Sequence, residues 1–83
     1  MNTRTAVQDR INQLCKEQGI TPNALSYCAG VPQATIKSIL SNRPEATQNA
    51  GIVTIKKICD GLSISLYDFF DTDIFRTLEQ EIK

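Results

Sequence analysis

The apolar residues of this chain recur at intervals of three and four along nearly its whole length, and they do not alternate with polar ones. The pattern begins with Val7, Ile11, Leu14 and Cys15 and returns in each later segment. This spacing places side chains on one face of an α-helix, whereas a strand buried on one face has a period of two. We therefore expect an all-α domain of five short helices, followed by a short C-terminal helical tail.

Length and composition restrict the chemistry that such a domain can perform. With 83 residues, the chain has room for one small core but not for two lobes with a cleft between them. It has no His, the usual general base near neutral pH. The three cysteines form no CxxC pair, so a four-coordinate zinc site is not expected. We expect no enzyme activity, no metal and no cofactor.

Nothing in the sequence indicates export or membrane insertion. The first ten residues, MNTRTAVQDR, lack a hydrophobic signal core, and no apolar run approaches the ~20 residues of a membrane-spanning helix. An odd number of cysteines suits a reducing compartment, where they act as small buried apolar groups. These features favour a soluble, cytoplasmic protein that does not bind membranes.

The net charge is zero, but the charges are unevenly distributed. Residues 1–43 carry five basic and two acidic groups, and residues 44–83 carry four basic and seven acidic groups, so the halves differ as +3 and −3. A basic half attracts phosphate, yet solvated helices often carry such a charge by chance. Charge alone does not decide the function.

Residues 21–40 predict two short helices joined by a sharp turn. Thr21 is a candidate N-cap, and Pro22 suits the first helical position, where an N–H is not needed. Gly30 ends this helix at about residue 29, and Pro32 directs Val31 into an extended conformation. The next helix covers about 32–41. Its inner face carries Ile36, Ile39 and Leu40, and its outer face carries Gln33, Ala34, Lys37, Ser38 and Ser41.

The remaining segments predict three helices and a loop. Thr5 and Gln8 have the spacing of a capping box at the start of the first helix, which Gly19 ends. Residues 42–50 are rich in turn-forming residues and indicate a loop. The fourth helix is marked by Ile52, Ile55, Ile58 and Cys59 and is stopped by Gly61. A second capping box, Ser65 with Asp68, begins a fifth helix that presents Leu66, Phe69 and Phe70 to the core.

Together these segments resemble the Cro and lambda-repressor type of helix-turn-helix domain, often called Xre-like. The residues that match the family's spacing are Leu25, Ala29, Gly30, Val31, Ile36 and Ile39. Residues 52–70, IVTIKKICDGLSISLYDFF, are similar to the family's fourth and fifth helices, so the resemblance spans about residues 6–70. It implies a lambda-repressor-like DNA-binding domain over 1–70 with a tail over 71–83. It also implies a sequence-specific transcriptional regulator, most often a repressor, that binds a palindromic operator in double-stranded DNA as a homodimer.

The resemblance makes 32–41 the recognition helix. The residues at base-reading positions are Gln33, Ala34, Lys37 and Ser38. A Gln amide can pair with adenine and a Lys can donate to guanine, and each good pair contributes ~1–3 kcal/mol of discrimination. The residues expected to contact phosphate are Thr21, Asn23, Asn42 and Arg43.

Three positions depart from the family pattern. Pro22 stands where the family usually has a Gln that reaches a phosphate and supports the recognition helix, so that contact is absent. Pro32 stands where a capping Ser is common, which leaves the recognition helix without an obvious side-chain cap. Ser26 replaces a usual Ala and is still small enough for close helix packing.

Other interpretations of the same residues remain open. The polar face of 33–43 can be a solvated surface, Cys28 can fill space between helices, and Tyr27 can lie at a surface edge or contact a phosphate through its hydroxyl. The tail stripe, Ile74, Leu78 and Ile82, either covers the core or forms a dimer seam. The whole domain can also serve as a protein-interaction module or as an antitoxin that binds a protein partner.

Overall fold

Six helices make up the described part of the chain. The computed structural model describes residues 2–41, 51–80 and 82, and within these residues there is no strand. The helices are α1 (Thr3–Gln18), α2 (Pro22–Ala29), α3 (Gln33–Leu40), α4 (Ile52–Gly61), α5 (Leu66–Phe70) and α6 (Asp73–Arg76). The predicted all-helical fold with a short C-terminal helix is confirmed. The loop predicted over 42–50 lies outside the described residues.

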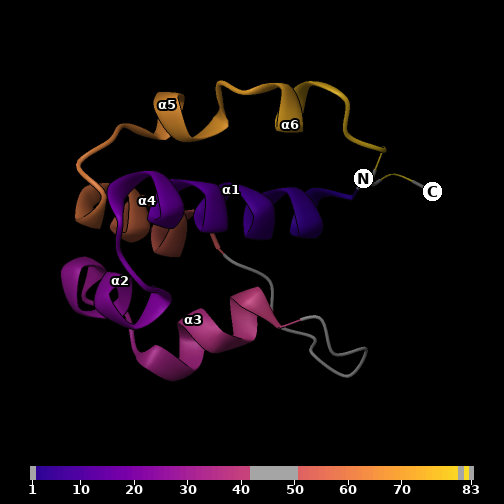
Figure 1. Cartoon of the computed structure of the whole chain (residues 1–83). Coiled ribbons are helices and arrows are strands. Elements are labelled where there is room, and N and C mark those ends of the chain that lie inside the picture. Colours follow the sequence, from indigo (N-terminus) through magenta and orange to yellow (C-terminus); the bar gives the residue numbers. More distant parts are fainter. Residues whose placement is uncertain (1, 42–50, 81, 83) are drawn as a thin grey trace.

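The helices are arranged around α1 (Figure 1). The pair α2 and α3 lies on one side of α1, while α5 and α6 lie on the other side, and α4 lies behind α1 in this view. Contacts join α2 to α3 and α4, α4 to α5, and α1 to α2 and α6. The helix-turn-helix pair therefore rests on α1 and α4, with α3 at the edge of the molecule.

One core joins α1 through α5, and it consists largely of the residues that the periodicity indicated. The buried core residues are Val7, Ile11, Leu14, Cys15, Leu25, Val31, Ile36, Ile39, Ile55, Ile58, Cys59, Leu62 and Phe69. Ile52 is an exception, because its side chain is 60% exposed at the start of α4. Cys28, which the sequence suggested as a filler between helices, is exposed.

Helix α1 begins earlier than the predicted capping box. Asn2 is the N-cap, and its side-chain oxygen accepts a 2.8 Å hydrogen bond from the backbone N–H of Thr5. Thr5 thus lies inside the first turn, and Gln8 is buried and has different partners. The capping box at Thr5 and Gln8 was therefore a wrong prediction: the spacing matched, but an Asn three residues earlier than Thr5 provides the same acceptor.

Two of the predicted helix stops are left-handed glycines, and the third acts differently. Gly19 and Gly30 both have φ near 66°, a conformation that costs glycine little. Gly61 belongs to the last turn of α4 and does not have a positive φ. A Cβ at Gly61 would lie 2.9 Å from the backbone nitrogen of Ala29. Gly61 is therefore required for the close approach of α4 to α2, not for a helix stop.

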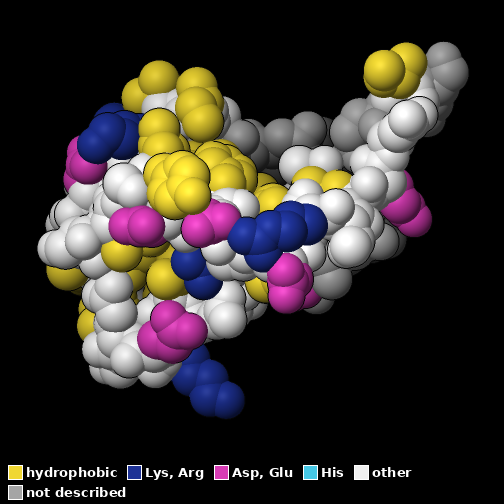
Figure 2. All heavy atoms as spheres, turned by 90° about the horizontal axis from the view of Figure 1, so that it is seen from above, with side chains coloured by type: hydrophobic (Ala, Val, Ile, Leu, Met, Phe, Trp, Pro, Cys, Tyr) yellow, Lys and Arg dark blue, Asp and Glu magenta, His cyan; other side chains and the backbone are white. Residues whose placement is uncertain are grey.

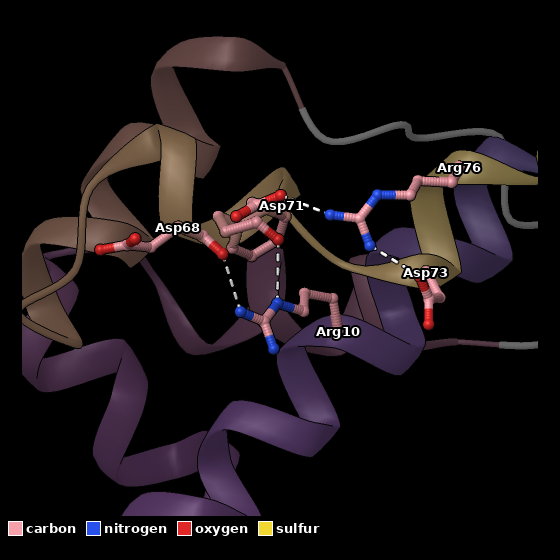
Figure 3. Close-up of polar contacts among 6 residues, drawn as sticks. Arg10, Asp68, Asp71, Asp73 and Arg76 are labelled. Carbon is pink, nitrogen blue, oxygen red and sulfur yellow. Dashed lines mark hydrogen bonds and ion pairs between the residues drawn. The ribbon is translucent and has the colours of Figure 1, made fainter.

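The segment after α4 is tied to α1 by one arginine (Figure 3). Ser65 caps α5 as predicted, accepting a 3.0 Å hydrogen bond from the N–H of Asp68. The Arg10 guanidinium donates through Nε to the carbonyl oxygen of Phe69 at 2.9 Å and through Nη2 to that of Asp68 at 2.8 Å. Because Arg10 lies in the middle of α1, it closes the end of α5 onto this helix.

The predicted helical stripe of the tail does not form. Helix α6 ends at Arg76, and Ile82 is 85% exposed. Phe75 instead packs its ring against Phe70, with ring centroids 4.9 Å apart, and against Phe69 at 5.9 Å. The start of the tail covers the core through this aromatic cluster.

Candidate nucleic-acid interface

Helix α2 is capped at both ends, and its C-terminal cap forms the turn to α3. The Thr21 hydroxyl oxygen accepts a 3.1 Å hydrogen bond from the N–H of Ala24, which confirms Thr21 as the N-cap of α2. At the other end, Gly30 is left-handed and the N–H of Val31 donates to the carbonyl of Ser26 at 3.0 Å. Val31 is buried, so the turn is anchored in the core.

Helix α3 has an apolar inner face and a polar outer face. Ile36 and Ile39 are almost fully buried, at 2% and 3% exposure. Of the predicted base-reading residues, Gln33, Ala34 and Lys37 are exposed, whereas Ser38 is half-buried. Three of the four side chains are therefore brought together on one outward surface, and Ser38 lies at its edge.

The C-terminal end of α3 is held by α1. The buried Gln8 side chain donates through Nε2 to the carbonyl oxygens of Ile39 at 2.8 Å and Ser41 at 3.0 Å. Arg4, one turn earlier, donates to the carbonyls of Ser38 and Ser41 at 3.3 and 3.4 Å. The Ser38 carbonyl also accepts from the N–H of Ser41 at 3.3 Å. The carbonyls at this end carry the negative end of the helix dipole, so a cationic donor is favourable there.

Gln8 was not predicted to position the recognition helix, although the sequence holds a signal for it. Gln8 lies three residues before Ile11 and seven before Cys15, in line with the apolar stripe of α1. A polar residue on a buried face needs hydrogen-bond partners there. The identity of those partners depends on the tertiary fold.

The N-terminal end of α3 is open. Pro32 is its N-cap residue, and no side chain in the described part of the chain caps this end, as the sequence predicted. Gln33, the first residue of the helix, donates from its amide Nε2 to the hydroxyl oxygen of Tyr27 on α2, at 3.2 Å. Tyr27 is 77% exposed, so this bond lies on the outward surface.

The predicted phosphate-contacting residues are only partly placed. Thr21 and Asn23 are both exposed at the start of α2. Ser26 is buried and its hydroxyl donates to the carbonyl of Asn23 at 2.6 Å, so the small residue fits as expected. Asn42 and Arg43 lie outside the described residues, and their roles stay predictions.

Two further features of the described residues bear on the site. They contain no group of three or more Cys, Asp or Glu side chains that could hold a metal ion. No helix among them is long and apolar enough to cross a bilayer.

An exposed polar helix, held at one end and preceded by a helix of equal length across a fixed turn, defines a helix-turn-helix DNA-binding domain. The family comparison agrees. Residues 10–73 match the model of the Cro/C1-type HTH DNA-binding domain, and the chain belongs to this family.

Two solved structures are similar to this one. The crystal structure of the prophage Lp1 protein 11 is 30% identical, has a TM-score of 0.77, and is matched over 94% of this chain and 100% of that one. A mutant of the restriction-modification controller protein C.Esp1396I is 25% identical, has a TM-score of 0.71, and is matched over 86% and 87%. No curated protein matches the chain at a significant level.

Proposed function

We propose that this protein is a sequence-specific transcriptional regulator, acting as a repressor, that inserts α3 into the major groove of a palindromic operator as a homodimer. The observation that carries this proposal is the exposed face of Gln33, Ala34 and Lys37 on a helix whose C-terminal end is fixed by Gln8. A fixed helix presents amide and ammonium donors at a constant position, which base-edge recognition requires. The activity needs binding alone and no catalytic step.

The family match and the similarity to a controller protein support the regulatory role. A bound repressor of this kind blocks access to the DNA that it covers, so occupancy of the site is sufficient for its effect. The alternative of an antitoxin-like or protein-interaction module predicts binding to a protein partner and no preference among DNA sequences.

The first experiment is selection of bound duplexes from a random DNA library with the purified protein at about physiological salt. We expect an enriched palindrome with half-sites about one helical turn, ~34 Å, apart. Gln33→Ala and Lys37→Ala should then lower discrimination at particular base pairs, whereas Arg43→Ala should weaken all duplexes alike and reduce the salt dependence. Lys56→Ala on α4 is a charge-matched control for Lys37→Ala. No enrichment at this or lower salt would refute the proposal.

The proposed homodimer needs an apolar interface between its two copies. That interface must leave both recognition helices facing the same side of the duplex. Figure 2 shows hydrophobic side chains gathered over α5, where Tyr67 is 74% exposed. That surface lies across α1 from α3 (Figure 1), and a seam there would turn the two α3 helices away from each other. Ile52 and Val53, 60% and 67% exposed at the start of α4, are the exposed apolar pair that we assign to the dimer seam.

The seam is tested by sedimentation equilibrium. Val53→Asp should dissociate the dimer and weaken operator binding, because an unpaired carboxylate would be buried between the copies. Asn12→Asp adds the same charge at an exposed position of α1 and serves as the control. A monomeric wild-type protein, or a Val53→Asp variant that remains dimeric, would refute the assignment of Ile52 and Val53 to the dimer seam.

A further inference from the structure

Tyr27 is a large side chain that the fold leaves outside the core but not without a partner. It lies in the last turn of α2, and its hydroxyl reaches across the turn to the first residue of α3, accepting the hydrogen bond from Gln33 Nε2 at 3.2 Å. Its backbone carbonyl also accepts a hydrogen bond from the N–H of Gly30 at 3.4 Å. The tyrosine is thus fixed at its backbone by the turn and joined at its tip to Gln33.

This bond determines which edge the Gln33 amide presents outward. The amide has one carbonyl oxygen and two N–H donors. When one N–H is used on Tyr27, the oxygen and the second N–H remain, and these are the acceptor and donor that pair with the N6 and N7 atoms of adenine. If the amide were turned over, its oxygen would accept from the tyrosine O–H through one of its two lone pairs, and the oxygen and the NH2 group would exchange places on the outward edge. The donor and the acceptor would then no longer match the N7 and N6 atoms of adenine.

When DNA is present, the two orientations of the Gln33 amide differ in whether the Tyr27 O–H is free to donate to a phosphate. A tyrosine hydroxyl has one O–H donor and can accept as well. While it accepts from Gln33, its O–H remains available to a phosphate oxygen of the DNA backbone. In the turned-over orientation the same O–H is used on Gln33 and no donor remains for phosphate. A phosphate close to Tyr27 therefore favours the orientation that reads adenine.

We propose that Tyr27 is a specificity-determining residue that holds the Gln33 amide in its adenine-reading orientation. This inference rests on the proposed function, because it assigns a role within the DNA-reading surface. Tyr27 acts through Gln33 and is a positioning residue for base recognition.

The test is Tyr27→Phe, which removes only the hydroxyl. Tyr67→Phe is the matched control, because Tyr67 is equally exposed, at 74%, and lies on α5. Each protein is titrated against the duplex selected by the wild type and against every single-base-pair variant of one half-site. A neutral exposed hydrogen bond contributes about 0.5–1.5 kcal/mol, so discrimination in favour of A·T at one position should fall about 2- to 10-fold. Other positions should keep their discrimination, and the salt dependence should be unchanged because no charge is removed.

A double-mutant cycle with Gln33→Ala separates positioning from a simple backbone contact. If Tyr27 acts through Gln33, Tyr27→Phe should have no further effect on base discrimination in the Gln33→Ala background. An equal effect in both backgrounds, or a uniform loss over all duplexes, would overturn the proposal and leave Tyr27 as a phosphate contact only.

A measurement on the free protein separates this inference from the proposed function. The side-chain amide resonances of Gln33 in an NMR spectrum should shift in Tyr27→Phe and remain unchanged in Tyr67→Phe. Unchanged resonances in Tyr27→Phe would overturn the inference even if selective DNA binding is found. If the resonances shift but the wild type selects no DNA sequence, the proposed function fails and the specificity role fails with it.

Discussion

The close approach of α4 to α2 gives a sharp prediction for Gly61→Ala. The added Cβ would lie 2.9 Å from the backbone nitrogen of Ala29 and 3.0 Å from its Cα. Ordinary contact begins at 3.4 Å, so the two helices would have to separate by about half an ångström. The neighbouring atoms belong to the backbone and cannot rotate away.

The expected magnitude follows from two opposing effects. Overpacking of a close contact costs about 1–3 kcal/mol, whereas Ala is better than Gly inside a helix by up to ~1 kcal/mol. The helix-propensity gain is smaller here because Gly61 is the last residue of α4. We expect a net loss of about 1–2 kcal/mol, which lowers the Tm of a domain of this size by about 4–16 °C.

The assay is thermal and urea unfolding followed by circular dichroism. Gly19 provides the comparison, because it has φ of 66° and open space around its Cβ position. Gly19→Ala should cost about 1–2 kcal/mol, and Gly19→Asn should recover part of it because Asn tolerates the left-handed conformation. Gly61→Asn should recover nothing. A Gly61→Ala protein as stable as the wild type, or a recovery with Asn, would refute the steric argument.

Three further predictions concern α1 and the thiols. Gln8→Leu should destabilise the fold by about 1–3 kcal/mol, because the carbonyls of Ile39 and Ser41 lose the hydrogen bonds that the Gln8 amide donates; an unchanged urea midpoint would contradict this. Arg10→Lys should increase amide hydrogen exchange in α5 more than in the other helices, since one ammonium cannot reproduce the two hydrogen bonds that the guanidinium donates to the carbonyls of α5. An equal increase in all helices would contradict this role of Arg10. Burial raises the pKa of both Cys15 and Cys59. The unfolded chain therefore loses thiol protons first, and the free energy of unfolding should fall as the pH rises through 9.0, the ordinary thiol value. A thiol reagent should label Cys28, which is exposed, in the folded protein and the other two only on unfolding; labelling of all three in the folded state would show that the core opens.

The sequence predicted those parts of the fold that depend on one segment at a time. The stripe from Val7 to Cys15 faces the core because a helix repeats every 3.6 residues, whatever it packs against. Thr21, Pro22 and Gly30 likewise act on their own backbone neighbours, so the bounds of α2 are recovered to the residue.

The wrong predictions concern contacts between segments that are far apart in the sequence. Gly61 looks like a helix stop in isolation, and only the position of Ala29, on another helix, shows why a side chain cannot be present. The tail has a period of four, but one turn of helix is enough to place Phe75 on the aromatic cluster. Beyond Arg76, Ile82 is 85% exposed, and a period of four does not sustain a longer helix unless its apolar face is packed.

The same distinction applies to the site. The outward residues Gln33 and Lys37 follow from the helical period and from the family resemblance. The support at the end of α3 does not, because Gln8 finds its carbonyl partners more than 30 residues away. The bond from Gln33 to Tyr27 joins two residues that the sequence placed on different helices without indicating that their side chains meet.

The way in which α3 is held has a consequence for how such a protein can diverge. Ile36, Ile39 and the Gln8 hydrogen bonds hold α3 from its inner side and its C-terminal end, whereas Gln33, Ala34 and Lys37 contribute little to the core. Mutations on the outward face are therefore nearly neutral for stability, and under the proposed function they can change which DNA sequence is preferred while the domain stays folded. A lineage can acquire a new target by changing two or three side chains, with Tyr27 changing together with Gln33.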